Sequence, residues 1–168
     1  EMDSSLAAEA VNKLDELIVE NVESRAAIEQ MKSHGPYDLI VCADVLEHLR
    51  DPWVVLQELV KMLNEGGQVI TSIPNVRHVS TFLALGIQGR WPRRDRGIHD
   101  KTHLRFFARP DILELGRNAG LECVRERRNL RLIESMPWTM IHDKALDFWP
   151  VRAFFTFQYL HLWRVRPA

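Results

Sequence analysis

The sequence predicts an α/β fold with a mostly parallel sheet, and three observations support this class. Residues 37–43 are apolar on both faces, which is typical of an inner strand of a parallel sheet. A helical segment separates this run from a second apolar run at 68–73, the spacing of a strand-helix-strand unit. The runs at 121–127 and 154–165 have no helix between them, which predicts an antiparallel pair at the end of the chain.

The first part of the chain predicts two helices around a short strand. Ser4 or Ser5 can cap a helix that runs to about Asp15, because apolar residues follow at helical spacing. A β-rich run at 17–19 indicates a short strand. Residues 24–33 then predict a weaker helix, which a Gly-Pro pair ends.

The segment after the strand at 37–43 begins with a strong helix signal. Asp51 can act as N-cap and Pro52 occupies the first helical position. The Gly-Gly pair at 66–67 is expected to end this helix before the strand at 68–73. Residues 77–88 predict one more helix.

The last third of the chain contains a basic loop, a helix and an insertion. Residues 89–108 have no clean period and are rich in Arg, Gly and His, so we expect a surface loop. A helix is predicted from 110 to 119, with Gly120 as its left-handed C′ residue. Residues 130–150, rich in Trp and Met, form an insertion to which no element is assigned.

Composition limits the class of protein. A chain of 168 residues with 46% hydrophobic residues can form one domain, 1–168, around one core. The longest apolar stretch, 153–163, is interrupted by polar residues and is too short to span a bilayer, so no membrane association is expected. Cys42 and Cys123 lie in apolar runs without a CxxC motif, which predicts buried reduced thiols and a cytoplasmic location.

Two motifs carry a family resemblance. Residues 37–49 read Tyr-Asp-Leu-Ile-Val-Cys-Ala-Asp-Val-Leu-Glu-His-Leu, and residues 102–107 read Thr-His-Leu-Arg-Phe-Phe. In this order and separation, with Ile-Pro-Asn at 73–75 between them, they resemble the class I S-adenosylmethionine-dependent methyltransferases over residues 1–121. The resemblance implies a Rossmann-like sheet and S-adenosylmethionine as cofactor.

The resemblance also implies that the chain is N-terminally truncated. A complete member has a strand, a Gly-rich turn and a helix before an acid that matches Glu1, and none of the eight glycines here forms a GxG turn. We therefore expect the carboxyl-terminal two-thirds of an enzyme, an incomplete sheet and poor cofactor binding by this chain. Without that strand, residues 37–43 would have an exposed hydrophobic edge, which predicts self-association.

Six residues match the family's positions around the cofactor: Glu1, Asn21, Val22, Ala43, Asp44 and Val45. Glu1 matches the acid that binds the ribose hydroxyls, and the alternative for it is a frayed terminal residue. Asn21 stands where relatives often carry an Asp that contacts adenine, so the chain departs from the pattern there. Asp44 and its neighbours follow the strand at 37–43, which the resemblance places beside the methyl group.

Two histidines are the candidate catalytic bases. Methyl transfer from a sulfonium is an in-line displacement, so the protein must align the reactants and remove a proton from an oxygen nucleophile. His48 is the first candidate base and His103 the second. The alternative is a well-bonded turn that only caps the next helix. The catalytic interpretation requires a cavity that reaches residues 44–48.

A divalent cation is a further hypothesis from the resemblance. Ubiquinone-pathway O-methyltransferases and small-RNA 2′-O-methyltransferases use a Glu-x-x-Glu-His turn, joined in the RNA enzymes by a later His, to hold a cation. Asp44, Glu47, His48 and His103 fall on those positions, although Asp44 is one methylene shorter than the matching Glu. Their oxygen and nitrogen atoms suit Mg²⁺, Mn²⁺ or Zn²⁺, and the alternative is a hydrogen-bond network without metal.

The basic loop is the candidate acceptor site. Arg96, His99 and Arg105 are expected to bind an anionic acceptor, while the alternatives are a solvated loop and, for Arg105, a structural pair with an acid near Glu47. The predicted function is O-methylation of a small-molecule or anionic glycan-type substrate. The alternative is a non-catalytic interaction module with a degenerate methyltransferase fold. Nucleic acid is not expected, since no recognition motif accompanies the arginines.

Overall fold

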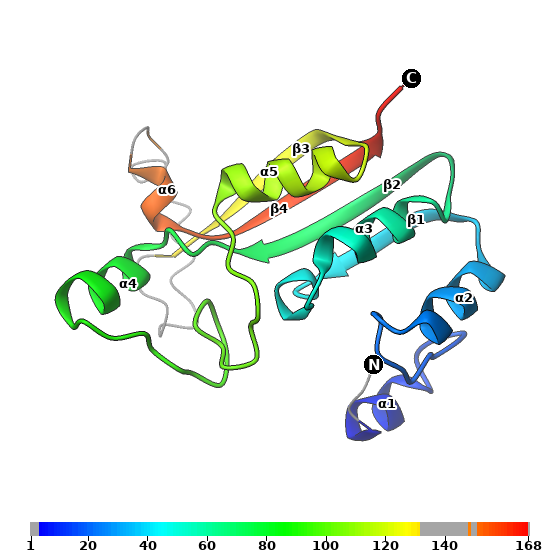
Figure 1. Ribbon diagram of the computed structural model, residues 1–168, viewed down its shortest axis with the longest axis horizontal. Coiled ribbons are helices and arrows are strands. Elements are labelled where there is room, and N and C mark those ends of the chain that lie inside the picture. The colour runs from blue at the N-terminus through cyan, green and yellow to red at the C-terminus, as the bar shows by residue number, and fades with distance from the viewer. Residues whose placement is uncertain (1–3, 132–147, 149–150, 168) are drawn as a thin grey trace.

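A computed structural model describes residues 4–131, 148 and 151–167 of the chain. Its sheet has four strands in the order β1-β2-β4-β3 (Figure 1). The bounds are β1 Tyr37–Ala43, β2 Leu63–Pro74, β3 Leu121–Leu130 and β4 Thr156–Val165. β1 and β2 are parallel, whereas β4 is antiparallel to both β2 and β3. The predicted α/β class and the antiparallel pair at the end of the chain are confirmed.

Two helices cover one face of this sheet. In Figure 1, α3 lies in front of β1 and β2, and α5 lies in front of β3 and β4. The helices are α1 Ser4–Ala10, α2 Arg25–His34, the 3₁₀ turn Leu46–His48, α3 Pro52–Val60, α4 Val79–Phe82, the π turn Leu83–Ile87, α5 Arg109–Asn118 and α6 Arg152–Phe155. None of those in the described ranges is long and apolar enough to cross a membrane.

Three helices have clear capping interactions, and of these the caps at Asp51 and Gly120 were predicted. Ser24 precedes α2, and its hydroxyl accepts a hydrogen bond from the Ala27 amide at 3.0 Å. The Asp51 carboxylate caps α3 by accepting from the Val54 amide at 3.1 Å, with proline at the first helical position. Gly120 follows α5 with a φ of 79°, the left-handed conformation that favours glycine.

Several predicted boundaries are wrong. Helix α1 ends at Ala10, and residues 17–19 form no strand because no described strand lies beside them to share its hydrogen bonds. Helix α3 ends at Val60, so β2 begins before the Gly-Gly pair and runs through it. A Cβ at Gly67 would lie 3.0 Å from the Tyr37 carbonyl oxygen, so glycine allows this close pairing of β1 and β2.

Two further expectations concern the cysteines and the insertion at 130–150. Cys42 is buried as predicted, and burial raises the pKa of its thiol to about 11, with the Glu47 charge as a smaller cause. Cys123 is exposed, contrary to the prediction, because it lies on β3, the outer strand next to β4. Most of the insertion at 130–150 lies outside the described residues.

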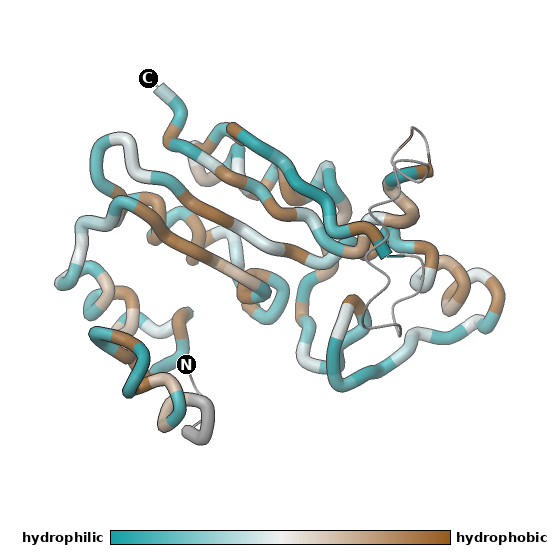
Figure 2. The backbone as a smooth tube through the Cα atoms, turned by 180° about the vertical axis from the view of Figure 1, so that it is seen from behind, coloured by the Kyte–Doolittle hydropathy of each residue, from teal (hydrophilic) through white to brown (hydrophobic). Residues whose placement is uncertain are grey.

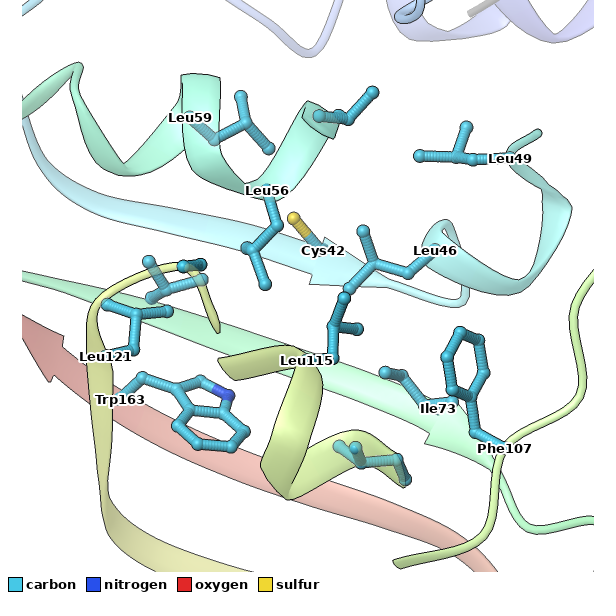
Figure 3. Close-up of a cluster of buried hydrophobic side chains, with 14 of the residues drawn as sticks. Cys42, Leu46, Leu49, Leu56, Leu59, Ile73, Phe107, Leu115, Leu121 and Trp163 are labelled. Atoms are coloured by element: carbon cyan, nitrogen blue, oxygen red, sulfur yellow. The ribbon is translucent and has the colours of Figure 1, made fainter. Parts of the chain in front are cut away.

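The core fills the space between the sheet and the helices α3 and α5. Figure 3 shows side chains from the sheet, α3 and α5 meeting around Leu56, Leu115 and Trp163. Trp163 on β4 is 1% exposed, and its indole N–H donates to the Thr71 hydroxyl at 2.9 Å. This hydrogen bond fixes the ring beneath α5, because a buried indole N–H needs a partner.

Gly116 allows α5 to approach this ring, and we expect Gly116→Ala to destabilise the protein. The added Cβ would lie 2.5 to 2.9 Å from three carbons of the fixed Trp163 ring. Overpacking of this kind costs about 1–3 kcal/mol, more than a helical alanine gains over glycine. Urea unfolding measures the change, with Gly86→Ala as control, since its Cβ would lie 3.6 Å from the Phe82 ring. Equal stability of the two variants would contradict the prediction.

Candidate active site

The turn after β1 is held in an uncommon backbone conformation. Asp44 has a φ of 51° and is the only residue other than glycine with a positive φ in the described ranges. Its amide donates to the Ser72 carbonyl at 3.1 Å, and its carboxylate accepts from the Gln158 amide group at 2.5 Å. Strained residues held in this way are frequent at functional sites.

A cavity of about 680 Å³ reaches this turn. It lies at the carboxyl ends of β1 and β2, where open α/β sheets bind ligands, and the basic loop forms another wall. The lining residues are Asp44, Glu47, His48, Pro74, Arg94, Asp95, Arg96, Gly97, Asp100, His103, Arg131, Phe157 and Gln158. The catalytic interpretation required a cavity here, and the structure contains one.

Glu47 is a buried carboxyl group in the wall of this cavity. Its side chain is 1% exposed, and neither carboxylate oxygen has a hydrogen-bond partner among the described residues. Burial raises the pKa of Glu47 to about 8, and repulsion from Asp44 and Asp100 adds to the effect. A buried carboxylate without a partner is unfavourable for folding, which indicates a functional reason for this position.

The hydrogen-bond network orients His48. The Thr102 hydroxyl lies 2.6 Å from a carboxylate oxygen of Asp100 and 3.1 Å from Nδ1 of His48. A carboxylate only accepts, so Thr102 donates its one proton to Asp100 and must accept from His48 Nδ1–H. In the neutral tautomer that this network selects, Nε2 of His48 carries the lone pair. The sequence analysis identified His48 as a candidate base and Thr102 as part of a family motif. It could not predict the hydrogen bond between them, because that contact depends on how the basic loop folds against the turn.

His103 lies beside His48, and its Nδ1 is likewise the ring nitrogen that forms a hydrogen bond. Its Nδ1 is 3.1 Å from the Ile98 carbonyl, which only accepts, so Nε2 of His103 also carries a lone pair. The two rings meet edge to face with their centroids 4.6 Å apart. Burial, together with the nearby His48, lowers the pKa of His103 despite the Ile98 hydrogen bond and favours the neutral ring.

Glu47, His48 and His103 form a group that could hold a metal ion. One ligand atom from each side chain lies within 4.8 Å of the others. The second nitrogen of each histidine is bonded to a fixed partner, which is the usual arrangement around metal-binding histidines. Asp44, the fourth residue of the hypothesis, lines the same cavity but lies outside this group.

The structure separates the three predicted acceptor residues. Arg96 lines the cavity, whereas His99 and Arg105 do not. His99 is fully buried, with Nε2 3.0 Å from the Thr81 hydroxyl, so it supports the loop from behind. The guanidinium of Arg105 donates to the Arg50 carbonyl, not to an acid, and lies over the Trp53 ring. A structural role for Arg105 agrees with one predicted alternative, but the partner differs.

The predicted cofactor residues lie mostly outside the cavity. Glu1 is not among the described residues. Asn21 is exposed and its described hydrogen bonds are local, to Glu20, Glu23 and Ser24, while Val22 packs against the core. Ala43 and Val45 flank Asp44, which alone of the five described candidates is among the lining residues of the cavity. Their contacts with a cofactor stay predictions.

Several cavity residues were missed by the sequence analysis, among them Asp100, Gln158 and Arg131. Asp100 carries a local signal, since an Asp two residues before a Thr amide is typical of an Asx turn. Gln158 and Arg131 carry none, because they reach the cavity only through the pairing of β4 with β2 and β3. The guanidinium of Arg131 lies 4.0 Å above the Phe157 ring, which fixes it at the cavity wall.

Comparison with known proteins gives one consistent family. The methyltransferase domain family matches residues 2–126. The ubiquinone biosynthesis O-methyltransferase of Bordetella avium is 32% identical over 127 residues, covering 73% of this chain and 50% of that protein. The Pseudomonas paraeruginosa protein of the same name is 37% identical over 101 residues, covering 56% and 41%. The chain spans about half or less of the length of these relatives.

Solved structures of low sequence identity share the fold. A methyltransferase from Archaeoglobus fulgidus, described as dependent on S-adenosylmethionine, superposes with a TM-score of 0.63 at 13% identity and covers 97% of this chain and 73% of that one. One from Clostridium acetobutylicum gives a TM-score of 0.60 at 13% identity, covering 99% and 74%. At this identity the likeness shows the fold alone.

Proposed function

The chain belongs to the methyltransferase domain family, and on this premise we propose that it forms the acceptor side of an S-adenosylmethionine-dependent O-methyltransferase. One observation carries the proposal. His48 and His103 both line a cavity at the end of β1, and the hydrogen bond at Nδ1 of each neutral ring leaves the lone pair on Nε2. A base at this place is needed for a hydroxyl acceptor, which must lose a proton as it is methylated.

We infer the following division of tasks in the cavity. S-adenosylmethionine, when bound, supplies a methyl group on a sulfonium. Nε2 of His48 would accept the proton that the acceptor hydroxyl loses when its oxygen is methylated. Thr102 and Asp100 hold the ring in the required tautomer. The proton then leaves the imidazolium for water.

A small hydroxylated molecule is the substrate class we propose. The Bordetella avium and Pseudomonas paraeruginosa relatives are named as O-methyltransferases of ubiquinone biosynthesis, which favours a small molecule over a glycan. Arg94, Arg96 and Arg131 line the cavity and would attract an acceptor that carries negative charge. Guanidinium groups bind carboxylates as well as phosphates in two-point contacts.

Cofactor binding separates this proposal from a non-catalytic module. We expect S-adenosylhomocysteine at 100 times its dissociation constant to stabilise the full-length protein by about 2.7 kcal/mol. Thermal unfolding measures this, and a methyl-transfer assay with phenols and sugars then identifies the acceptor class. A protein that S-adenosylhomocysteine does not stabilise, and that methylates none of these compounds, would support the interaction module instead.

As an alternative division of tasks, we propose that Glu47, His48 and His103 hold a divalent cation, in which case the Nε2 lone pair of His48 binds the ion and does not accept the hydroxyl proton. The group fits, since the Glu47 oxygens have no partner in the described structure and Nδ1 of each histidine is hydrogen-bonded elsewhere, which leaves Nε2 for the ion. One oxygen and two nitrogen ligands suit Mn²⁺ or Zn²⁺. Such a cation would lower the pKa of a bound acceptor hydroxyl.

Titration calorimetry with Mn²⁺ tests this cation site. We expect heat of binding in the full-length protein and its loss in His103→Gln. Asp95→Asn is the matched control, because Asp95 lines the same cavity but lies outside the three-residue group. An absence of heat in the unmodified protein would favour the alternative, a hydrogen-bond network without metal.

Three other expectations stay predictions. Self-association is consistent with the position of β1 at one edge of the described sheet, where Leu39 and Val41 are 48% and 56% exposed. In Figure 2, which shows the opposite side of the molecule from Figure 1, hydrophobic segments run along β1 and β2. The expected cytoplasmic location and the expected absence of nucleic-acid binding also remain predictions.

A further inference from the structure

A second cavity, which we call the arginine cavity, is surrounded by positive charge. It has a volume of about 420 Å³ and shares no lining residue with the candidate active site. Its walls come from the segment after β2, the start of α5, β3, α6 and β4. The lining residues are Arg77, Arg109, Pro110, Arg128, Arg152, Ala153 and Tyr159.

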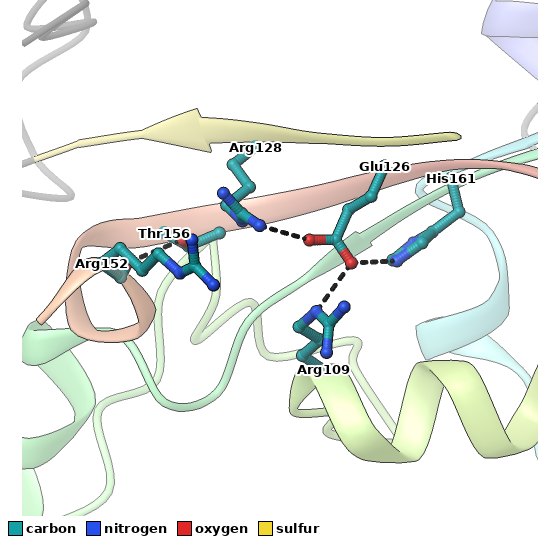
Figure 4. A network of polar contacts seen from close by, with 6 residues as sticks. All are labelled: Arg109, Glu126, Arg128, Arg152, Thr156 and His161. Atoms are coloured by element: carbon teal, nitrogen blue, oxygen red, sulfur yellow. Dashed lines mark hydrogen bonds and ion pairs between the residues drawn. The ribbon is translucent and has the colours of Figure 1, made fainter. Parts of the chain in front are cut away.

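One carboxylate, Glu126, organises two of the four arginines. Its Oε2 accepts from Arg109 Nε at 2.7 Å, and its Oε1 accepts from an Arg128 Nη at 2.9 Å. Figure 4 shows these two guanidinium groups on either side of the Glu126 carboxylate, with Arg152 nearby. Burial opposes the charge on Glu126, but the hydrogen bond and charge of Arg109, with a smaller contribution from Arg128, lower its pKa. Glu126 is therefore ionised, and it fixes both arginines before any ligand arrives.

The described residues of the arginine cavity carry an excess of positive charge. Among them, four guanidinium groups face the single carboxylate of Glu126, and burial lowers the pKa of the nearby His161, so that ring adds no charge near neutral pH. Within the described residues, neither Arg77 nor Arg152 forms an ion pair with a carboxylate. Arg77 instead lies 5.1 Å from the centre of the Phe154 ring. An excess of three charges matches a ligand with more than one negative charge.

We propose that the arginine cavity binds a soluble phosphate-bearing molecule at a site separate from methyl transfer. Guanidinium groups bind phosphate oxygens in pairs through charge-assisted hydrogen bonds, and several arginines around one cavity suit a group with three acceptor oxygens. A carboxylate has two oxygens and one charge, so it would leave most of the excess unmatched. The fixed side chains of Arg109 and Arg128 reduce the entropy lost on binding.

Calorimetry with pyrophosphate as probe tests the proposal in the full-length protein. We expect binding that weakens as the salt concentration rises and that is stronger than the binding of acetate. The double variant Arg77→Gln, Arg152→Gln should bind pyrophosphate at least about tenfold more weakly, since it loses charge-assisted hydrogen bonds. Its thermal unfolding and its binding of S-adenosylhomocysteine should match those of the unmodified protein, so this result is independent of the proposed function.

Arg127→Gln is the matched control. Arg127 lies between Glu126 and Arg128 on β3, so its side chain points to the opposite face, and it does not line the cavity. Equal losses in the control and the double variant would overturn the proposal, because they would indicate a general charge effect. No binding of pyrophosphate would overturn it as well. Binding only to vesicles that contain phosphatidic acid would overturn the assignment to a soluble ligand.

Discussion

Replacing His48 with glutamine should lower kcat of methyl transfer by about 10² to 10⁴-fold, the usual contribution of a general base. Glutamine is close to histidine in polarity but cannot accept the hydroxyl proton. Steady-state kinetics on the full-length protein measures the loss, and calorimetry with S-adenosylhomocysteine should show unchanged cofactor affinity. Both measurements are needed, because a loss of cofactor binding would also lower the rate.

Two variants make the His48 result specific. His34→Gln is the control, since His34 lies on α2, pairs with Glu16 on the surface and should leave kcat unchanged. Thr102→Val removes the hydroxyl that accepts from His48 Nδ1–H, so a smaller loss of kcat is expected. Full activity in His48→Gln with a large loss in His103→Gln would instead assign the base to the second candidate.

The second large effect concerns stability. Glu47→Gln should raise the free energy of unfolding of the metal-free protein above pH 8, while it abolishes Mn²⁺ binding. The pKa of Glu47 is raised from 4.5 to about 8, so the folded state holds a proton that the unfolded state releases earlier. Stability is therefore highest below pH 4.5, falls as the pH rises towards 8 and is constant above it. Glutamine cannot ionise, so the variant lacks this decline.

The size of this effect follows from the burial of the carboxyl group. Each pKa unit corresponds to about 1.4 kcal/mol, and after allowance for local relaxation we expect a gain of about 2–4 kcal/mol. Urea unfolding at pH 5 and pH 8.5 in the presence of a chelator measures it. Glu65→Gln is the control, because Glu65 is exposed. An unchanged pH dependence in Glu47→Gln would show that the buried carboxyl group is not the cause.

A stability gain combined with a loss of metal binding would define the role of Glu47. Natural proteins keep unfavourable groups where function needs them, and replacing such a group often stabilises the fold. Glu47 has this character, since it is 1% exposed and has no described hydrogen-bond partner for its carboxylate. The same reasoning does not apply to Glu126, which is also poorly exposed but paired with two arginines.

The sequence alone determined the features that depend on neighbouring residues. The start of α3 follows from Asp51 and Pro52, and the end of α5 follows from Gly120, because capping interactions join residues within one turn of each other. The apolar run of β1 and the motif after it located the turn that lines the cavity. These signals are local, so they could be recognised without the fold.

Only the tertiary structure decided the features that join distant segments. Residues 17–19 have strand propensity but no described neighbour, and a strand needs a partner for its backbone hydrogen bonds. His99 looked like a binding residue of a basic loop, yet Thr81 and Trp91 hold it in a buried position. Gln158 reaches Asp44 only because β4 pairs with β2. Burial, strand pairing and cavities depend on contacts between residues far apart in the chain, and periodicity and capping signals do not encode those contacts.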